Sequence, residues 1–198
     1  MDWYAELDRC NNLEELENIT KGCKKCHLCE KAKQVVFGKG SYNAPVMLVG
    51  EAPGADEDNQ GIPFVGRAGQ LLDKILTSAG INDVYITNIA KCRPPENRLP
   101  TREEVEACWP YLVRQIELTK PRIIVCLGAL ATQQLIHPQA KITMVHGKVY
   151  TKGGIKLVPT FHPAALLRDP SKKKPCWNDF KVIRAIYDSL KERGVAVG

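Results

Sequence analysis

Short apolar runs alternate with amphipathic segments along the chain, and this alternation limits the possible folds more than any other feature. VMLVGEA (46–52), VYITNIAKC (84–92) and RIIVCLG (122–128) are nearly continuous apolar runs, as expected of strands buried on both faces. Strands that alternate with helices predict a mostly parallel sheet covered by helices on both sides. We therefore expect an α/β fold.

The segments between these runs carry helix signals. GRAGQLLDKILTSAG places apolar residues on one helical face and ends at Gly80. Thr101 and Glu104 form a capping box at the start of a second helix. A short helix is expected from about Ala129, and apolar residues from Trp177 to Leu190 predict a long closing helix. KVYTKGGIKLVPTFHP is typical of a hairpin that turns at Gly153-Gly154.

The predicted strands end in chemically distinctive segments. These are GEAPG, TNIAKCRPP and LGA, with TFHPAALLR following the hairpin. Ligands of parallel sheets bind beyond the carboxyl ends of the strands. We therefore expect the functional residues to meet at this edge.

Composition restricts the protein class. A chain of 198 residues with 44% hydrophobic residues can form one domain with a full core and without disulfides. The N-terminal segment is acidic and amphipathic, so no secretory signal or membrane span is expected, and a cytoplasmic protein is predicted. The net charge of +6 is compatible with a polyanionic partner but is not specific for one.

Eight cysteines in a reducing compartment suggest ligands for a metal or cluster. Cys23 and Cys26 form a CxxC pair, and Cys92 and Cys108 form a second pair. Four thiolates suit tetrahedral zinc or a four-iron cluster, and the spacing does not choose between them. Cys29 competes for one ligand position.

The other three cysteines lie outside these pairs. Cys126 lies within a predicted strand and is expected to be inert, and Cys10 and Cys176 are expected to be structural.

The loop GEAPGADEDNQGIPFVG (50–66) is a weak phosphate-binding candidate, because it lacks the P-loop spacing and carries four acidic residues. Taken with its neighbours it is more informative. The ordered set GEAPGxxED, PFVGRAGQLLD, YITNIAKCRPPENR and FHPAALLR resembles the family 4 uracil-DNA glycosylases from about residue 20 to 190. The resemblance implies a three-layer α/β/α fold with a central, mostly parallel, four-stranded sheet.

The resemblance implies an enzyme that flips uracil out of DNA and hydrolyses its N-glycosidic bond. It would leave an abasic site and start base excision repair, without lyase activity. Phe64 would stack on the flipped base, Asn88 would pair with uracil N3–H and O4, and Glu57 would exclude the thymine methyl group.

Glu51 and His162 are the implied catalytic partners of Asn88. Glu51 would place water or counter the positive sugar, and His162 would donate to uracil O2. Ala52 also lines the implied pocket, where some other glycosylases carry an Asp that acts as a strong general base. Leu166 and Leu167 would fill the vacated base stack, and Arg168 and the following lysines would bind phosphate.

The cysteines also resemble the family's iron–sulfur ligands, which implies a [4Fe-4S] cluster on Cys23, Cys26, Cys92 and Cys108. Cys29 does not match a ligand position. The predicted organisation is one domain over residues 1–198, with an N-terminal helix and the CxxC segment (1–30) packed on it through the cluster. The predicted protein is a monomer that acts on single- or double-stranded uracil-containing DNA, and a replication clamp is a further candidate partner.

Three other functions compete with this prediction. A binding module would recognise uracil without cutting, but the loop RPPENRLPT lacks the His and the insertion of the covalently trapping branch. An inactive structural domain would be expected to lack Glu51, Asn88 or His162, and all three are present. A zinc-stabilised nucleotide-binding protein is the third.

Overall fold

The computed structural model describes residues 3–192. A six-stranded sheet in the order β1-β3-β2-β4-β6-β5 forms its centre. The strands are β1 (Lys39–Gly40), β2 (Val46–Gly50), β3 (Val84–Asn88), β4 (Ile123–Leu127), β5 (Tyr150–Lys152) and β6 (Ile155–Thr160). The four inner strands are mutually parallel, whereas β1 and β5 pair antiparallel at the two edges.

The α/β/α class is confirmed, and the predicted count of four strands is correct only for the parallel centre. The edge strand β1 has two residues and no alternating pattern that would reveal it. It lies against β3 because Gly40 has no side chain: a Cβ there would collide with the carbonyl oxygen of Val84. The hairpin of β5 and β6 turns at Gly153 and Gly154, as predicted, with φ of 53° and 81°.

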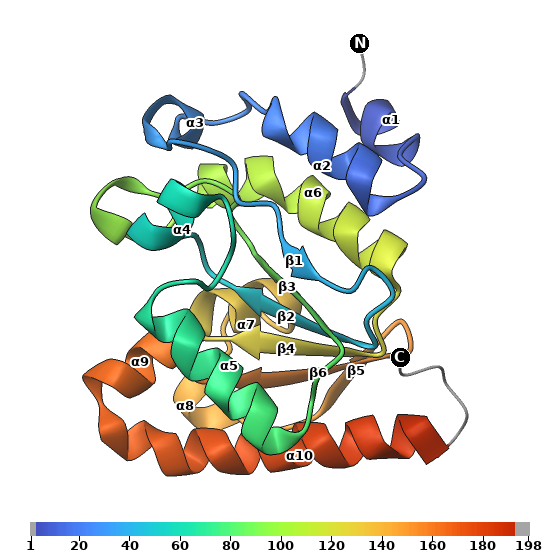
Figure 1. The fold of residues 1–198 in the computed structure, drawn as a ribbon, viewed down its shortest axis with the longest axis vertical. Helices are drawn as coiled ribbons and strands as arrows, with labels where there is room; N and C mark the ends of the chain where they lie inside the picture. Colours follow the sequence, from blue (N-terminus) through green and yellow to red (C-terminus); the bar gives the residue numbers. More distant parts are fainter. Residues whose placement is uncertain (1–2, 193–198) are drawn as a thin grey trace.

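Helices cover both faces of the sheet (Figure 1). Above it in that view lie α1 (Trp3–Asp8), α2 (Leu13–Lys21) and α6 (Arg102–Thr119). Below it lie α5 (Arg67–Ala79) and α10 (Lys173–Glu192). The shorter elements are α3 (Leu28–Lys31), α4 (Ala55–Gln60), η1 (Pro95–Asn97), α7 (Ala129–Leu135), α8 (Ile142–Val145), α9 (Pro163–Arg168) and η2 (Pro170–Lys172).

Each central strand contributes side chains to two separate cores. Met47 and Val49 of β2 pack with the α2 and α6 side, whereas Val46 and Leu48 pack with α5 and α10. This alternation follows from the two-residue period of a strand. Because both faces are buried, β2 and β4 are apolar throughout, and their sequences predicted this.

The N-terminal segment is held on the domain by apolar packing. Leu7, Leu13 and Leu16 join the core that contains Val105 and Leu112 of α6. In place of the predicted N-terminal helix the structure has two helices, α1 and α2, before the CxxC segment. Apolar burial therefore anchors the segment whether or not a cluster also binds it.

The helix signals in the sequence are confirmed. Gly80 ends α5 in the left-handed conformation with φ of 68°. Thr101 and Glu104 form the capping box of α6. None of the helices in the described part of the chain combines the length and apolar character of a membrane span.

Candidate active site and cysteine cavity

A cleft of about 510 Å³ lies at the carboxyl ends of the parallel strands. Segments spread between residues 51 and 172 line it, including Glu51, Asn88, Gly128 and His162. In Figure 1 the arrows of β2, β4 and β6 point toward this edge, where α4 and α9 also lie. The structure thus brings the candidate residues together at the edge where the sequence predicted them to meet.

Asn88 ends β3, and only 1% of its surface is exposed. Its side-chain oxygen Oδ1 is buried and accepts no hydrogen bond within the described protein. An unpaired buried acceptor is costly, so its presence in a cleft marks a place for a ligand donor. The site therefore offers a fixed acceptor at its base.

Gly50, at the end of β2, is a site residue that the sequence prediction missed. A Cβ at this position would lie 2.4 Å from Asn88 Oδ1 and 2.7 Å from Phe64 Cζ. Any side chain there would separate the amide from the aromatic ring. The glycine in GEAPG was visible in the sequence, but its role depends on a contact between β2 and β3.

Phe64 lines the cleft with 5% of its surface exposed. Its φ of 54° is unusual for a bulky residue, so the surrounding structure must hold it there. The close packing of Gly69 against the Phe64 backbone and a 3.0 Å bond from Lys39 Nζ to the Phe64 carbonyl oxygen provide that restraint. The ring centre lies 5.6 Å from that of His162.

Both oxygens of the Glu57 carboxylate accept hydrogen bonds from the backbone. Oε1 accepts from the N–H groups of Val65 and Gly66, both at 2.9 Å, and Oε2 accepts from Gly54 N–H at 3.1 Å. Glu57 lines the cleft and also fixes the segment directly after Phe64. Sequence reasoning missed this second role, because the bonds run between residues eight and nine positions apart.

His162 follows β6 and precedes α9. Burial lowers its pKa to about 4, with a further contribution from Arg168. Its Nδ1 accepts from Ala164 N–H at 3.2 Å. A neutral ring that accepts at Nδ1 carries its proton at Nε2. At neutral pH, His162 is therefore a neutral hydrogen-bond donor.

Glu51 directly follows β2 in the same cleft, and Ala52 lies beside it. Burial raises the pKa of Glu51, while Arg168 opposes that shift. A carboxylate that is partly desolvated interacts strongly with nearby positive charge. Ala52 contributes no titratable group, so Glu51 is the carboxyl side chain at this turn.

The structure separates the two leucines predicted to fill the base stack. Leu167 is 40% exposed, whereas Leu166 is 2% exposed and belongs to the core under α9. Leu166 therefore does not fit the predicted wedge role in this structure, because the amphipathic period of α9 turns it inward.

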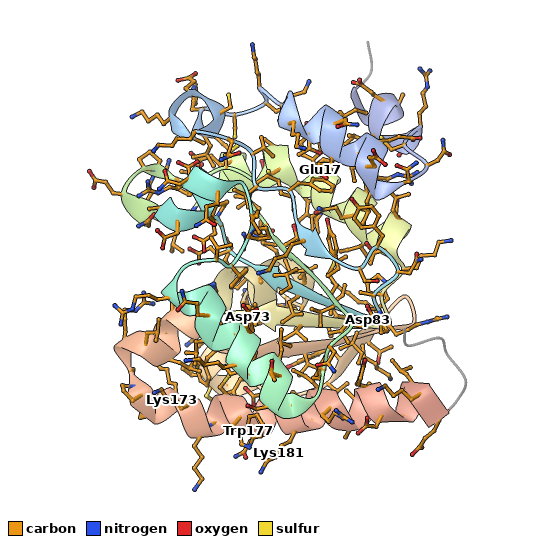
Figure 2. The ribbon with its side chains drawn as sticks, viewed as in Figure 1. Glu17, Asp73, Asp83, Lys173, Trp177 and Lys181 are labelled. Atoms are coloured by element: carbon orange, nitrogen blue, oxygen red, sulfur yellow. The ribbon has the colours of Figure 1, made fainter. Side chains whose placement is uncertain are left out.

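Arg168 is exposed and lines the cleft. Lys173 is also exposed and lies at the end of α10 next to α9 (Figure 2).

A second cavity contains the thiols. Its lining includes Cys23, Cys26, Cys29, Cys92 and Cys108. Burial and, to a smaller extent, the neighbouring thiols raise the pKa of Cys92 to about 12. Burial raises the pKa of Cys108 to about 11. Lys91 N–H donates to Cys108 Sγ at 3.3 Å. Among residues 3–192, no three Cys, His, Asp or Glu side chains converge closely enough to hold a single ion.

The other predicted inert cysteines are confirmed as core residues. Cys10, Cys126 and Cys176 are each at most 2% exposed. Burial raises the pKa of all three thiols, to about 12 for Cys126 and about 11 for Cys176. These cysteines are therefore weak candidates for ligation or reaction.

Comparison with known proteins agrees with this geometry. Residues 37–181 match the family described as the Uracil DNA glycosylase superfamily. The type-4 uracil-DNA glycosylase of Pyrobaculum aerophilum is 48% identical over 171 residues, which cover 81% of this chain and 87% of that protein.

Two further relatives are also type-4 uracil-DNA glycosylases. The type-4 uracil-DNA glycosylase of Archaeoglobus fulgidus is 46% identical, with 86% of this chain and 92% of that protein covered. The enzyme of Thermotoga maritima is 45% identical, with 81% and 87% covered. The chain therefore belongs to the uracil-DNA glycosylase superfamily and, within it, to the type-4 family.

Proposed function

We propose that this protein removes uracil from DNA by hydrolysing the N-glycosidic bond, leaving an abasic site and no strand break. The observation that carries the proposal is the unpaired, buried Oδ1 of Asn88 at the base of the cleft. Uracil N3–H is a donor that would satisfy this acceptor. Family membership supports the same reaction.

Asn88 would read the base through both ends of its amide. Oδ1 would accept from uracil N3–H while Nδ2 donates to O4. Cytosine presents the opposite pattern at these positions, so it would leave the amide mispaired in a buried site. Phe64, which approaches Asn88 closely because Gly50 has no side chain, would stack on the flipped ring.

His162 would stabilise the leaving group. Cleavage gives an oxocarbenium-like sugar and places negative charge on the departing uracil. The Nε2 proton of neutral His162 would form a hydrogen bond to uracil O2 as that charge develops. The depressed pKa suits this role, because the ring remains a neutral donor and does not transfer a full proton.

Glu51 would act on the positive charge that develops on the sugar. Its carboxylate, partly shielded from solvent in the cleft, would stabilise the positive sugar or orient the attacking water. Glu57 would lie beside the C5 edge of the base and exclude the thymine methyl group. Its three backbone hydrogen bonds support this role, because a fixed carboxylate is an effective steric barrier.

Leu167 and Arg168 would contact the DNA around the flipped nucleotide. The exposed leucine fits the vacated position in the base stack, and Arg168 with the lysines at 172–174 fits the phosphates. A contact with a replication clamp and a monomeric state stay predictions from the resemblance.

The thiol cavity fits a [4Fe-4S] cluster on Cys23, Cys26, Cys92 and Cys108. The cavity gathers these four cysteines from two distant segments. Their spread around a cavity suits a cluster, whose ligands lie farther apart than those of one zinc ion. The thiols whose pKa is raised need a cationic partner to remain thiolates at neutral pH. When bound, the cluster would supply a structural crosslink.

Matched cysteine variants test the cluster. We expect Cys23→Ser, Cys26→Ser, Cys92→Ser and Cys108→Ser each to lower the iron and sulfide content and bleach the visible absorption. Cys29→Ser is the control, since Cys29 lines the same cavity and should leave four irons in place. Zinc in the purified wild-type protein, or loss of iron only in Cys29→Ser, would contradict the assignment.

Uracil release tests the enzymatic function. Purified protein is incubated with an end-labelled oligonucleotide that contains one uracil, and alkali then cleaves any abasic site. A matched thymine strand and a cytosine strand are the controls. We expect cleavage at uracil alone, and only after alkali treatment. Uracil DNA that is shifted on a gel but never cleaved would instead indicate a binding module.

A further inference from the structure

Exposed apolar side chains gather around the cleft. Leu99, Met144 and Leu167 are 64%, 68% and 40% exposed. Each follows or adjoins residues that line the cleft, such as Arg98, Thr143 and Arg168. Single exposed apolar side chains are common on protein surfaces, but several around one cleft mark an interaction surface. Leu167 already has a proposed role, whereas Leu99 has none.

The loop that carries Leu99 is held in a strained conformation. Glu96 and Asn97 have φ of 54° and 55°, in the left-handed region that residues other than glycine rarely adopt. Pro94 and Pro100 on either side are buried. Such strain persists only where surrounding contacts enforce it, and it concentrates at functional sites.

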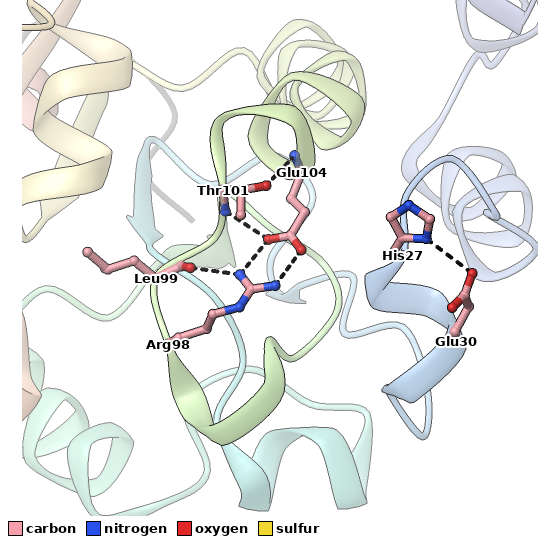
Figure 3. A network of polar contacts seen from close by, with 6 residues as sticks. All are labelled: His27, Glu30, Arg98, Leu99, Thr101 and Glu104. Atoms are coloured by element: carbon pink, nitrogen blue, oxygen red, sulfur yellow. Dashed lines mark hydrogen bonds and ion pairs between the residues drawn. The ribbon is translucent and has the colours of Figure 1, made fainter.

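A carboxylate from α6 enforces the loop conformation (Figure 3). Glu104, whose side chain is 7% exposed, accepts two hydrogen bonds from the Arg98 guanidinium at 2.6 and 2.8 Å. Arg98 also donates to the carbonyl oxygen of Leu99 at 2.9 Å, and Glu104 accepts from Thr101 N–H. These bonds fix the backbone on both sides of Leu99. Figure 3 shows its side chain pointing away from the ion pair.

The two rims of the cleft differ in charge. At the 93–102 loop the arginines already have partners: Arg93 binds Asn97, Arg98 binds Glu104 and Arg102 binds Glu106. At α9, Arg168 has no hydrogen-bond or ion-pair partner among residues 3–192, and Lys173 and Lys174 are exposed. The α9 rim is therefore suited to phosphates, whereas at the loop rim carboxylates neutralise Arg98 and Arg102, and Leu99 is exposed beside them.

We propose that Leu99 packs against the nucleobase next to the flipped uracil, as a second apolar contact across the cleft from Leu167. The ligand is the face of a base that becomes exposed when its neighbour leaves the stack. A rigid leucine loses little entropy on binding, which favours this use of a strained loop. The inference rests on the proposed uracil excision and adds to it a residue that shapes the DNA.

The test uses duplexes with one uracil and 2-aminopurine on its 5′ or its 3′ side, because 2-aminopurine fluorescence reports stacking. Wild type is compared with Leu99→Ala, Leu167→Ala and Val149→Ala. Val149 is 45% exposed and does not line the cleft, so its variant controls for loss of an exposed apolar side chain. Single-turnover excision and inhibition by free uracil are measured for all four proteins.

We expect Leu99→Ala to lower kcat/KM about tenfold, in line with the loss of one buried leucine contact. It should change the 2-aminopurine signal on one side of uracil, and Leu167→Ala should change it on the other. Inhibition by free uracil should stay at the wild-type level, since the base pocket is intact. Leu99→Ala that matches Val149→Ala in rate and fluorescence would overturn the inference, while absent excision by wild type would overturn the proposed function.

Discussion

The base pocket and the thiol cavity are built in opposite ways. The pocket groups lie on strand ends or directly after them: Asn88 ends β3, Glu51 follows β2 and His162 follows the last residues of β6. The cavity draws thiols from a short N-terminal segment and from both ends of the 92–108 stretch. The sheet itself therefore positions the pocket, whereas the cavity joins segments that are far apart in sequence.

This difference extends to the electrostatics. The pocket contains a neutral donor at His162 and an unpaired acceptor at Asn88, both ready for a neutral base. The cavity contains thiols whose pKa is raised by burial, so it requires added positive charge. The pocket needs no added group, whereas the proposed cluster would complete the cavity.

Lys91 joins the two regions. Its backbone N–H donates to Cys108 Sγ, while its buried side-chain Nζ donates to the Asn88 carbonyl oxygen at 2.6 Å. Thr87 Oγ1 and Gln115 Oε1 accept its other two hydrogen bonds at 2.8 and 2.6 Å. One residue thus links a proposed cluster ligand to the strand end that carries Asn88, whose amide is proposed to read the base.

The largest separable effect should come from His162→Ala. We expect uracil excision to slow about 100- to 1,000-fold, because one hydrogen bond to the developing anion is lost. Iron content should be unchanged, since His162 belongs to the pocket and not to the cavity. His137→Ala, at an exposed position, is the control. A fall of less than tenfold in single-turnover rate would remove His162 from the leaving-group role.

Lys91→Met tests the link between the two regions. The substitution keeps most of the side-chain volume but leaves three buried acceptors without their donor. We expect a loss of about 3 kcal/mol in the free energy of unfolding, measured with denaturant. Excision should fall while the backbone bond to Cys108 and the iron content are retained. Excision at the wild-type rate would show that Asn88 is positioned without Lys91.

The free energy of unfolding should also depend on pH through His162. The pKa of His162 is about 4 in the folded protein and 6.5 without its surroundings, so the unfolded state binds more protons between these values. The free energy of unfolding should therefore rise with pH from about 4 to 6.5, and this contribution is complete above that range. Denaturant unfolding of wild type and His162→Gln at several pH values isolates the effect. Parallel pH profiles for the two proteins would contradict it.

The smallest effect is expected at the 93–102 loop, which lies between the thiol cavity and the base pocket. Glu104→Ala removes the half of the α6 capping box in which the Glu104 carboxylate accepts from Thr101 N–H, and it removes the ion pair with Arg98. We expect the free energy of unfolding to fall by about 1 kcal/mol from the lost cap alone. Glu106→Ala is the control, because its pair with Arg102 is exposed and surface pairs contribute little. Equal effects of the two substitutions would show that the Glu104 contacts do not stabilise the loop.

Sequence reasoning predicted features that depend on local pattern or on chain order. The apolar runs predicted β2, β3 and β4, and the Gly80 and Thr101 signals located helix ends. The strand-end motifs indicated where the cleft forms. Residues such as Asn88 and His162 could be selected because their motifs occur in the order typical of one family.

Features that depend on contacts between distant segments were not predictable. The need for Gly50 follows from the approach of Phe64 and Asn88, and the three bonds of Lys91 depend on how β3 lies against α6. Leu166 and Leu167 are identical in type and adjacent in sequence, so only the orientation of α9 shows that one is core and the other is exposed.

The measurement that tests the account most directly is single-turnover uracil excision by Asn88→Ala beside wild type, on strands that carry uracil or cytosine. We predict that excision of uracil falls by at least about 100-fold, that iron content and thermal stability stay near those of wild type, and that neither protein acts on cytosine. Excision of uracil by Asn88→Ala at the wild-type rate would contradict the central claim that the buried amide of Asn88 reads the base.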